Sequence, residues 1–324
     1  MWRDDRIVPV LMYHSIGPRR PGWAFAQLSE SVASFAGTLD ALHSDGFQTV
    51  GLSELYDHMA GSRPLDRRSV VITFDDGYLD NWVHAVPLLR KYGMRATVYV
   101  TTEFVDDTDK VRPQSRSPGE PVRDCDGFMN WSELAAAQAE GVLDVQSHAM
   151  THTWYFTGPK LVDVHRPRSP DPYPWLAWNA RPDRKPFYMN ENQQRYVPWG
   201  YPVFEHEKAL LARRFEPDRN TLDAIVGWVE EQGGAAFFDD AGWRGALAGR
   251  FPFLRGAGSV PGRLESGTER CARVLDELRR SRTILEERLD KPVRFFAWPG
   301  GGVDPEVVAL AREAGYLSWT LSSW

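Results

Sequence analysis

The chain has 324 residues, of which 42% are hydrophobic and 25% are charged, and its formal net charge at pH 7 is -6. This size and composition are typical of a globular protein with one large domain or two ordinary ones. The acidic balance argues against a nucleic-acid-binding surface, which requires clustered basic residues. Two cysteines, Cys125 and Cys271, are too few for a disulfide framework or a cysteine-based zinc cluster.

The N-terminal stretch MWRDDRIVPVLMYHS has only a short apolar run and no small-residue cleavage site after it. It is therefore not typical of a secretory signal. No run along the chain approaches the roughly 18 apolar residues that a membrane span requires. We therefore expect a protein without an integral membrane segment and with a cytoplasmic location, or an extracytoplasmic one if a leader has been removed.

Apolar runs bounded by turn residues predict strands, in chain order, at 8–12, 70–74, 96–100, 142–146 and 293–298. Amphipathic segments between them predict helices at 31–46, 81–93, 131–141 and 268–290. The first three of these segments close in glycine, which is typical of a helix C-terminus. Strands that alternate with helices indicate a parallel sheet with covered faces, either open or closed into a barrel.

The segment 153–264 interrupts this alternation and is rich in Pro, Trp, Tyr and Arg, with one helix expected at 221–234. It is too long for a plain connection and too aromatic for a disordered linker, so we predict an insertion folded against the core. Its aromatic residues could line a glycan groove or form a small core of their own: Trp154, Tyr155, Trp175, Trp178, Tyr188, Trp199 and Tyr201. Its arginines could meet an anionic substrate group or belong to a solvated face: Arg166, Arg168, Arg181, Arg184 and Arg195.

Two acidic residues, Asp75 and Asp76, end a predicted strand in VVITFDDGY, just before Gly77. The carboxyl ends of parallel strands are where sites form in α/β sheets and barrels. Adjacent carboxylates on a regular strand point to opposite sides, whereas on a turning chain they can share one site. An Asx-type turn without a chemical role is the alternative interpretation.

Two histidines, His148 and His152, follow another predicted strand in QSHAMTH. Their i,i+4 spacing corresponds to one helical turn, which would let both imidazoles bind one cation. With a carboxylate from a neighbouring strand end they would form a site of two histidines and one aspartate that leaves positions open for water and substrate, as in catalytic zinc sites. Exposed helix histidines are the alternative.

A third strand end, RFFAWPGG at residues 294–301, is closed by Pro and Gly. Trp298 and Pro299 could form a substrate-contacting wall there, or belong to an ordinary loop before the helix expected near Asp304.

The motifs TFDDGY, SHAMTH and FFAWPGG, in this order, resemble the NodB-homology polysaccharide deacetylases of carbohydrate esterase family 4. The resemblance covers residues 6–152 and 265–324. It implies an α/β fold, a deformed (β/α)7-type barrel, so that 1–324 would be a single catalytic domain with the aromatic-rich insertion 153–264. It also implies hydrolysis of N-acetyl groups on amino sugars.

Transferred to this sequence, the family pattern assigns Asp75 as the general base. It assigns Asp76, His148 and His152 as ligands of one divalent metal ion, Zn²⁺ in the first place, with Co²⁺, Ni²⁺ or Fe²⁺ also compatible. The backbone N–H of Tyr78 would help to hold the oxyanion.

The family also requires a general acid, in many members a histidine in a last motif, yet no histidine follows His206 here. A circularly permuted subgroup, to which poly-N-acetylglucosamine deacetylases belong, carries this histidine at the end of an N-terminal strand. VLMYHSIG resembles that strand, which assigns His14 as the acid; a core histidine is the alternative. A second departure is that FAWPGG lacks the arginine that orients the base in the family, a place that Arg294 or an arginine of the insertion could take.

These residues lead us to expect a metal-dependent hydrolase that removes N-acetyl groups from amino sugars of a bacterial-type surface polysaccharide or its precursor, with an N-acetylated glycan as partner. Hydrolysis of another amide, such as an N-formyl group, is possible on the same scaffold. A catalytically silent carbohydrate-binding relative is a further alternative, but it would have no reason to keep both Asp75 and His14.

Overall fold

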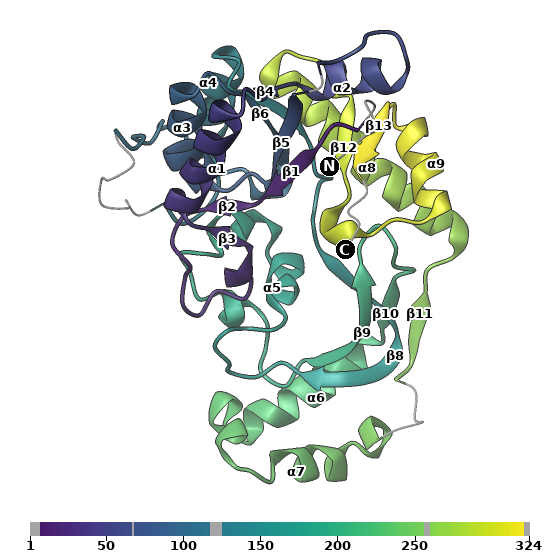
Figure 1. Cartoon of the computed structure of the whole chain (residues 1–324). Coiled ribbons are helices and arrows are strands. Elements are labelled where there is room, and N and C mark those ends of the chain that lie inside the picture. The colour runs from purple at the N-terminus through teal and green to yellow at the C-terminus, as the bar shows by residue number, and fades with distance from the viewer. Residues whose placement is uncertain (1–6, 67, 117–124, 256–259, 321–324) are drawn as a thin grey trace.

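A computed structural model of the chain describes residues 7–66, 68–116, 125–255 and 260–320. Within these residues a parallel sheet runs in the order β1-β5-β6-β7-β12-β13, with β4 paired to the start of β5 (Figure 1). The strands are β1 (Val10–Tyr13), β4 (Gln48–Thr49), β5 (Ser69–Asp76), β6 (Ala96–Val100), β7 (Leu143–Ser147), β12 (Phe295–Ala297) and β13 (Ser318–Thr320). The sheet curls into part of a barrel, which confirms the expected deformed (β/α)7-type fold.

The register brings the carboxyl ends of the strands to one edge. Tyr13 of β1 lies opposite Phe74 of β5, and Asp76 lies opposite Val100, the last residue of β6. Val100 in turn lies opposite Ser147, the last residue of β7. The loops that follow these strands therefore meet at a single edge, where side chains from distant parts of the sequence can form a site.

Helices cover the outer face of the sheet, with α1, α3 and α4 on one side and α8 and α9 on the other (Figure 1). Side chains from both layers, among them Phe35 and Leu278 from the helices and Ile72 and Phe296 from the strands, share one buried core. The helix bounds are α1 (Val32–Ser44), α2 (Leu52–Met59), α3 (Val86–Lys91), α4 (Trp131–Ala139), α8 (Gly267–Leu289) and α9 (Pro305–Glu313).

Two predicted elements are shorter than expected. The helix predicted at 81–93 begins as a π-helical turn, Asn81–Ala85, and becomes α-helical only at Val86. Pro87 explains the change, because it has no N–H for the Val83 carbonyl, which accepts from the Ser115 N–H instead (2.9 Å). The strand predicted at 293–298 is confined to β12, because the turn Pro299–Gly301 follows directly.

The segment from β8 to β11 occupies the lower part of Figure 1. Two antiparallel pairs form it, β8 (Trp154–Val164) with β9 (Pro202–Lys208) and β10 (Phe215–Pro217) with β11 (Gly262–Leu264). The helix predicted at 221–234 is α6 (Arg219–Glu231), and α5 (Pro174–Ala180) and α7 (Trp243–Arg250) were not predicted. Much of its aromatic content is buried, as with Trp175 and Phe204.

Among the helices in the described ranges, none has the length and apolar character needed to cross a membrane. The prediction that the N-terminus is not a secretory signal rests partly on residues 1–6, which lie outside the described ranges.

The β2 (Ser15–Ile16) and β3 (Ser29–Glu30) strands pair beside the sheet and fix the chain that leaves β1. Gly17 N–H donates to the Glu30 carbonyl at 2.9 Å, which continues the pairing by one residue. The loop that starts at His14 is therefore held on both sides, by β1 before it and by β2 after it.

Candidate active site

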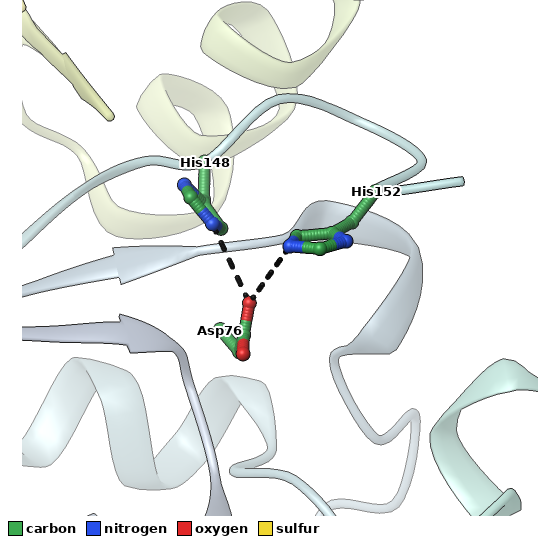
Figure 2. Close-up of side chains that lie close together, drawn as sticks. All are labelled: Asp76, His148 and His152. Atoms are coloured by element: carbon green, nitrogen blue, oxygen red, sulfur yellow. Dashed lines mark ion pairs between the residues drawn. The ribbon is translucent and has the colours of Figure 1, made fainter. Parts of the chain in front are cut away.

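Asp76, His148 and His152 converge at the carboxyl edge of the sheet (Figure 2). The Nε2 atoms of both imidazoles lie 3.4 Å from the same carboxylate oxygen, Oδ1 of Asp76. One possible ligand atom from each residue lies within 4.8 Å of the other two. This set of two nitrogen donors and one carboxylate fits a divalent cation such as zinc.

Asp76 reaches this position because the chain turns at the end of β5. Its φ of 72° and the φ of 84° at Gly77 place two consecutive residues in the left-handed region. Glycine adopts this conformation without strain, whereas for an aspartate it is uncommon. The turn lets Asp75 and Asp76 line the same cavity instead of pointing to opposite faces of a strand.

The two histidines meet through a loop, and the helical turn inferred from their spacing is absent from the described segment 148–153. Ala149 has a φ of 62° and His152 a φ of 42°, so the chain reverses between β7 and β8 through two left-handed residues. A sequence separation of four suits this reversal as well as it suits a helix. The predicted proximity of the two side chains is therefore found, but on a different local structure.

The second ring nitrogen of His148 determines its tautomer. Nδ1 lies 2.9 Å from the carbonyl oxygen of Ala297, and a carbonyl can only accept, so Nδ1 carries the proton. Nε2 then presents its lone pair toward Asp76, as in metal-binding histidines oriented by a backbone carbonyl. Burial, together with the neighbouring His152, lowers the pKa of His148 to about 3, which keeps the ring neutral at physiological pH.

The two carboxyl groups differ in proton affinity. Burial alone would raise the pKa of Asp76, but the imidazoles of His152, His148 and His14 outweigh it and hold this pKa below its usual value. For Asp75, burial and the adjacent Asp76 charge act in the same direction and raise its pKa well above the ordinary value. One carboxylate is thus kept ionised for a cation, while its neighbour readily takes up a proton.

His14 lies at the end of β1 and lines the same cavity. The Asn81 side-chain N–H donates to its backbone carbonyl at 2.8 Å. The next two residues are held by the buried Asp80, which accepts from the Ser15 hydroxyl (2.5 Å) and from the Ile16 N–H (3.0 Å). Burial lowers the pKa of His14, against the opposing attraction of Asp76.

Tyr78 presents a backbone N–H that takes no part in its pairing with Phe128. It pairs with Phe128 in an isolated antiparallel bridge in which Leu79 N–H donates to Gly127 and Met129 N–H donates to Gly77. In such a pair the bridge residues point their own N–H groups away from each other. The Tyr78 N–H therefore points away from Phe128, and the residue lines the cavity.

The third motif, RFFAWPGG, supplies some of the residues that line the cavity. Trp298 lines the cavity, as predicted, together with Gly300 and Gly301. Pro299 is buried in the turn and is not among the lining residues. Arg294 is exposed and precedes β12, at the end of the strand opposite to the site, so it does not take the place of the family's arginine.

The cavity has a volume of about 430 Å³. The segment 153–264 supplies Trp154, Trp178 and Tyr188 to its wall, whereas Trp175 is buried in the core. Some of the aromatic residues of this segment thus line the cavity, and others lie in a buried core. Val10 and Met12 of the VLMYHSIG strand also line the cavity. The rest of its wall carries no motif and was not predicted: Phe25, Gln27, Leu28, Phe104 and Phe128.

The arginines of this segment serve mainly its own structure. Arg168 pairs with Asp163 at 2.6 Å, Arg181 pairs with Asp183 at 2.8 Å, and Arg184 pairs with Glu191. Among the described residues that line the cavity there is no arginine. These side chains therefore do not form the anion-binding group that was considered for the site.

Comparisons with known proteins agree with this geometry. The family model described as "Polysaccharide deacetylase" matches residues 62–193. The YxkH protein of Bacillus subtilis (strain 168), named as a polysaccharide deacetylase, is 37% identical over 93 residues, 29% of this chain and 31% of that protein. The poly-β-1,6-N-acetyl-D-glucosamine N-deacetylase of Escherichia coli (strain K12) is 25% identical over 113 residues, 35% of this chain and 16% of that enzyme. The matches thus span less than a third of either relative's length.

Solved structures extend the likeness of the fold to nearly the whole chain. A de-N-acetylase from Aggregatibacter actinomycetemcomitans superposes with a TM-score of 0.57 at 16% identity, covering 96% of this chain and 86% of the other. The BpsB deacetylase domain from Bordetella bronchiseptica gives a TM-score of 0.57 at 18% identity, covering 99% and 90%. The segment 62–193 is similar to the polysaccharide deacetylase family, and the motif-bearing strand ends and the curled parallel sheet agree with the NodB-type fold of its structural neighbours.

Proposed function

We propose that this chain is a metal-dependent N-deacetylase that acts on an amino sugar of a surface polysaccharide or its precursor. The observation that carries the proposal is the convergence of five side chains on one cavity from three strand ends, those of β1, β5 and β7. Asp76, His148 and His152 offer donors within 4.8 Å of one another. Asp75 and His14 line the same cavity and can transfer protons.

The donor set fits a divalent cation, because the tautomer of His148 is already fixed and Asp76 is held in its ionised form. When bound there, such an ion would lower the pKa of a water molecule and polarise the substrate carbonyl. Two imidazoles and one carboxylate suit Zn²⁺, and Co²⁺, Ni²⁺ or Fe²⁺ accept the same donors.

Asp75 acts as the general base in this proposal. Its carboxylate takes a proton from the attacking water as the oxygen–carbon bond forms, and its raised pKa makes it a stronger base than an exposed aspartate. The carbonyl oxygen then carries negative charge, and the Tyr78 N–H donates to it.

His14 acts as the general acid. Its imidazolium gives a proton to the leaving nitrogen, the carbon–nitrogen bond breaks, and acetate and a free amine are the products. Asn81 and Asp80 hold the backbone around His14, so the ring approaches the cavity from a fixed position.

The substrate class is supported by the cavity walls and by the relatives. Trp154, Trp178 and Tyr188 present aromatic rings, which suit the flat apolar faces of sugar rings. One relative is named as a deacetylase of poly-β-1,6-N-acetyl-D-glucosamine, which favours an N-acetylated amino sugar here.

The experiment measures zinc content by elemental analysis and acetate release from N-acetylglucosamine oligomers, for the wild type and Asp76→Ala. We expect about one zinc ion per wild-type chain with acetate release, and the loss of both in the variant. Asp107→Ala, at an exposed aspartate, is the matched control and should behave like the wild type. Zinc binding without acetate release would indicate that the protein removes an acyl group other than acetyl. Zinc retained in Asp76→Ala would refute the assignment of Asp76 as a ligand.

A further inference from the structure

Lys185 is a buried lysine on the 3-10 turn Pro182–Phe187 of the segment 153–264. Only 1% of its surface is exposed. Lysine is almost never fully buried unless its charge is paired, so its contacts indicate why it is there. The ammonium forms an ion pair with Glu103 and donates to the backbone carbonyl of Thr151 at 2.9 Å.

Thr151 lies in the loop that carries the candidate ligand His152. This loop contains two left-handed residues that are not glycine, Ala149 and His152. Such a conformation is strained and persists only where surrounding contacts determine the backbone. The position of the His152 ring beside Asp76, seen in Figure 2, therefore depends on what holds residues 149–151.

One set of contacts holds the first half of the loop. The Ala149 carbonyl accepts from Thr102 N–H at 3.2 Å and from the Ser281 hydroxyl at 3.0 Å. The Met150 carbonyl accepts from Glu103 N–H at 3.0 Å. These donors lie on the chain after β6 and on α8, so the barrel itself fixes this part.

The second half is held by two charged side chains. The Thr151 N–H and hydroxyl both donate to one oxygen of the buried Glu277, at 3.2 and 2.6 Å. The Thr151 carbonyl, on the other side of the residue, accepts from Lys185. Thr151, the residue directly before His152, is thus held by Glu277 through its N–H and hydroxyl groups and by Lys185 through its carbonyl group.

We propose that Lys185 is a positioning residue for the cation site, which keeps His152 beside Asp76 through the Thr151 carbonyl. The inference rests on the proposed function, because it assumes that these residues bind a cation. It gives the segment 153–264 a role in metal affinity, in addition to the wall that this segment supplies to the cavity.

Charge and position predict opposite effects when Lys185 is removed. A positive charge near a cation site repels the cation, so its removal alone would strengthen zinc binding. If the ammonium instead holds the loop, its removal weakens zinc binding, since supporting contacts around metal ligands typically contribute about 10–100-fold in affinity. The sign of the change therefore separates the two effects.

The test compares Lys185→Met with the wild type by titrating the metal-free full chain with Zn²⁺ against a competing chelator. We expect zinc affinity to fall about 10–100-fold. Lys160→Met is the matched control, because Lys160 is an exposed lysine on β8 of the same segment, and it should leave zinc affinity unchanged.

A second variant separates positioning from general stability. Lys185→Met leaves Glu103 without its partner, which destabilises the fold. Lys185→Met/Glu103→Gln removes that unpaired charge and should recover much of the thermal stability, yet it should still bind zinc weakly, because the Thr151 carbonyl still lacks its donor. If Lys185→Met does not fold, the double variant provides the same test, because it also removes the donor to the Thr151 carbonyl.

Unchanged or tighter zinc binding in folded Lys185 variants would overturn the inference, and so would recovery of full affinity in the double variant. Failure of the proposed function would look different, because the wild type itself would then bind no zinc.

Discussion

Replacement of Asp75 by asparagine should increase the stability of the metal-free protein while abolishing most of its activity. Asp75 is only 8% exposed, and burial and the charge of Asp76 raise its pKa well above the ordinary value. In the unfolded chain the group ionises near its model value of 3.8. The folded metal-free protein therefore bears a free-energy cost for ionising Asp75 that the unfolded chain does not bear.

The sign and the pH range follow from this difference. Below the unfolded pKa both states are protonated and the cost is absent. As the pH rises toward the folded pKa, the unfolded chain releases its proton first, so the folded state loses stability; above the folded pKa the loss is complete. Each tenfold difference in proton affinity corresponds to about 1.4 kcal/mol. For a chain of this size, 1 kcal/mol changes Tm by on the order of 2 °C.

The assay is thermal unfolding of metal-free wild type and Asp75→Asn between about pH 4 and pH 8. We expect the Tm advantage of the variant to be small at the acidic end and to grow with pH, and to shrink in saturating zinc, because the cation compensates the two carboxylates. Asp107→Asn, at an exposed position, should show no such trend.

Catalysis supplies the second measurement on the same variant. Zinc content should stay at the wild-type level, while deacetylation should fall by about 10²–10⁴-fold, the usual contribution of a general base. A lower Tm for metal-free Asp75→Asn at neutral pH would refute the electrostatic reasoning, and a near-wild-type rate would refute the assignment of the base.

Three further predictions follow from the site. His148→Ala should lose zinc as well as activity, because it removes a buried donor 3.4 Å from Asp76; zinc retained at one ion per chain would contradict this. His14→Ala should bind zinc normally and should lose more activity on N-acetyl sugars than on an acetate ester. It should also lack the fall in kcat/KM at high pH that deprotonation of His14 causes in the wild type. Equal losses of activity on the amide and the ester would argue against His14 as the general acid. Asn81→Ala removes the 2.8 Å bond to the His14 carbonyl, so kcat on amides should fall severalfold with zinc affinity unchanged, which a loss confined to KM would contradict.

Some of the site was predictable from short motifs because regular structure is local. An apolar strand followed by a polar turn places its last side chains at the carboxyl edge of a parallel sheet, whatever the rest of the fold does. Asp75 and Asp76 at the end of β5, and His148 after β7, could therefore be assigned to one edge from the sequence.

The local conformation between His148 and His152 could not be predicted in the same way. A spacing of four residues fits a helical turn, but here the chain reverses through left-handed Ala149 and His152. Only contacts from distant residues, such as Ser281 and Lys185, determine that conformation. Residue spacing carries no information about such contacts.

The sequence by itself determined which polar residues stand at the strand ends, namely Asp75 and Asp76 at the end of β5, His148 after β7 and His14 after β1, because strand formation follows the local apolar pattern. The tertiary structure decided the rest: that Trp154 lines the cavity while Trp175 does not, that Pro299 is buried and does not line it, and that Lys185 contacts the loop of His152. These outcomes depend on packing between segments far apart in sequence, and the free energy of such packing comes from shape and burial that no short motif contains.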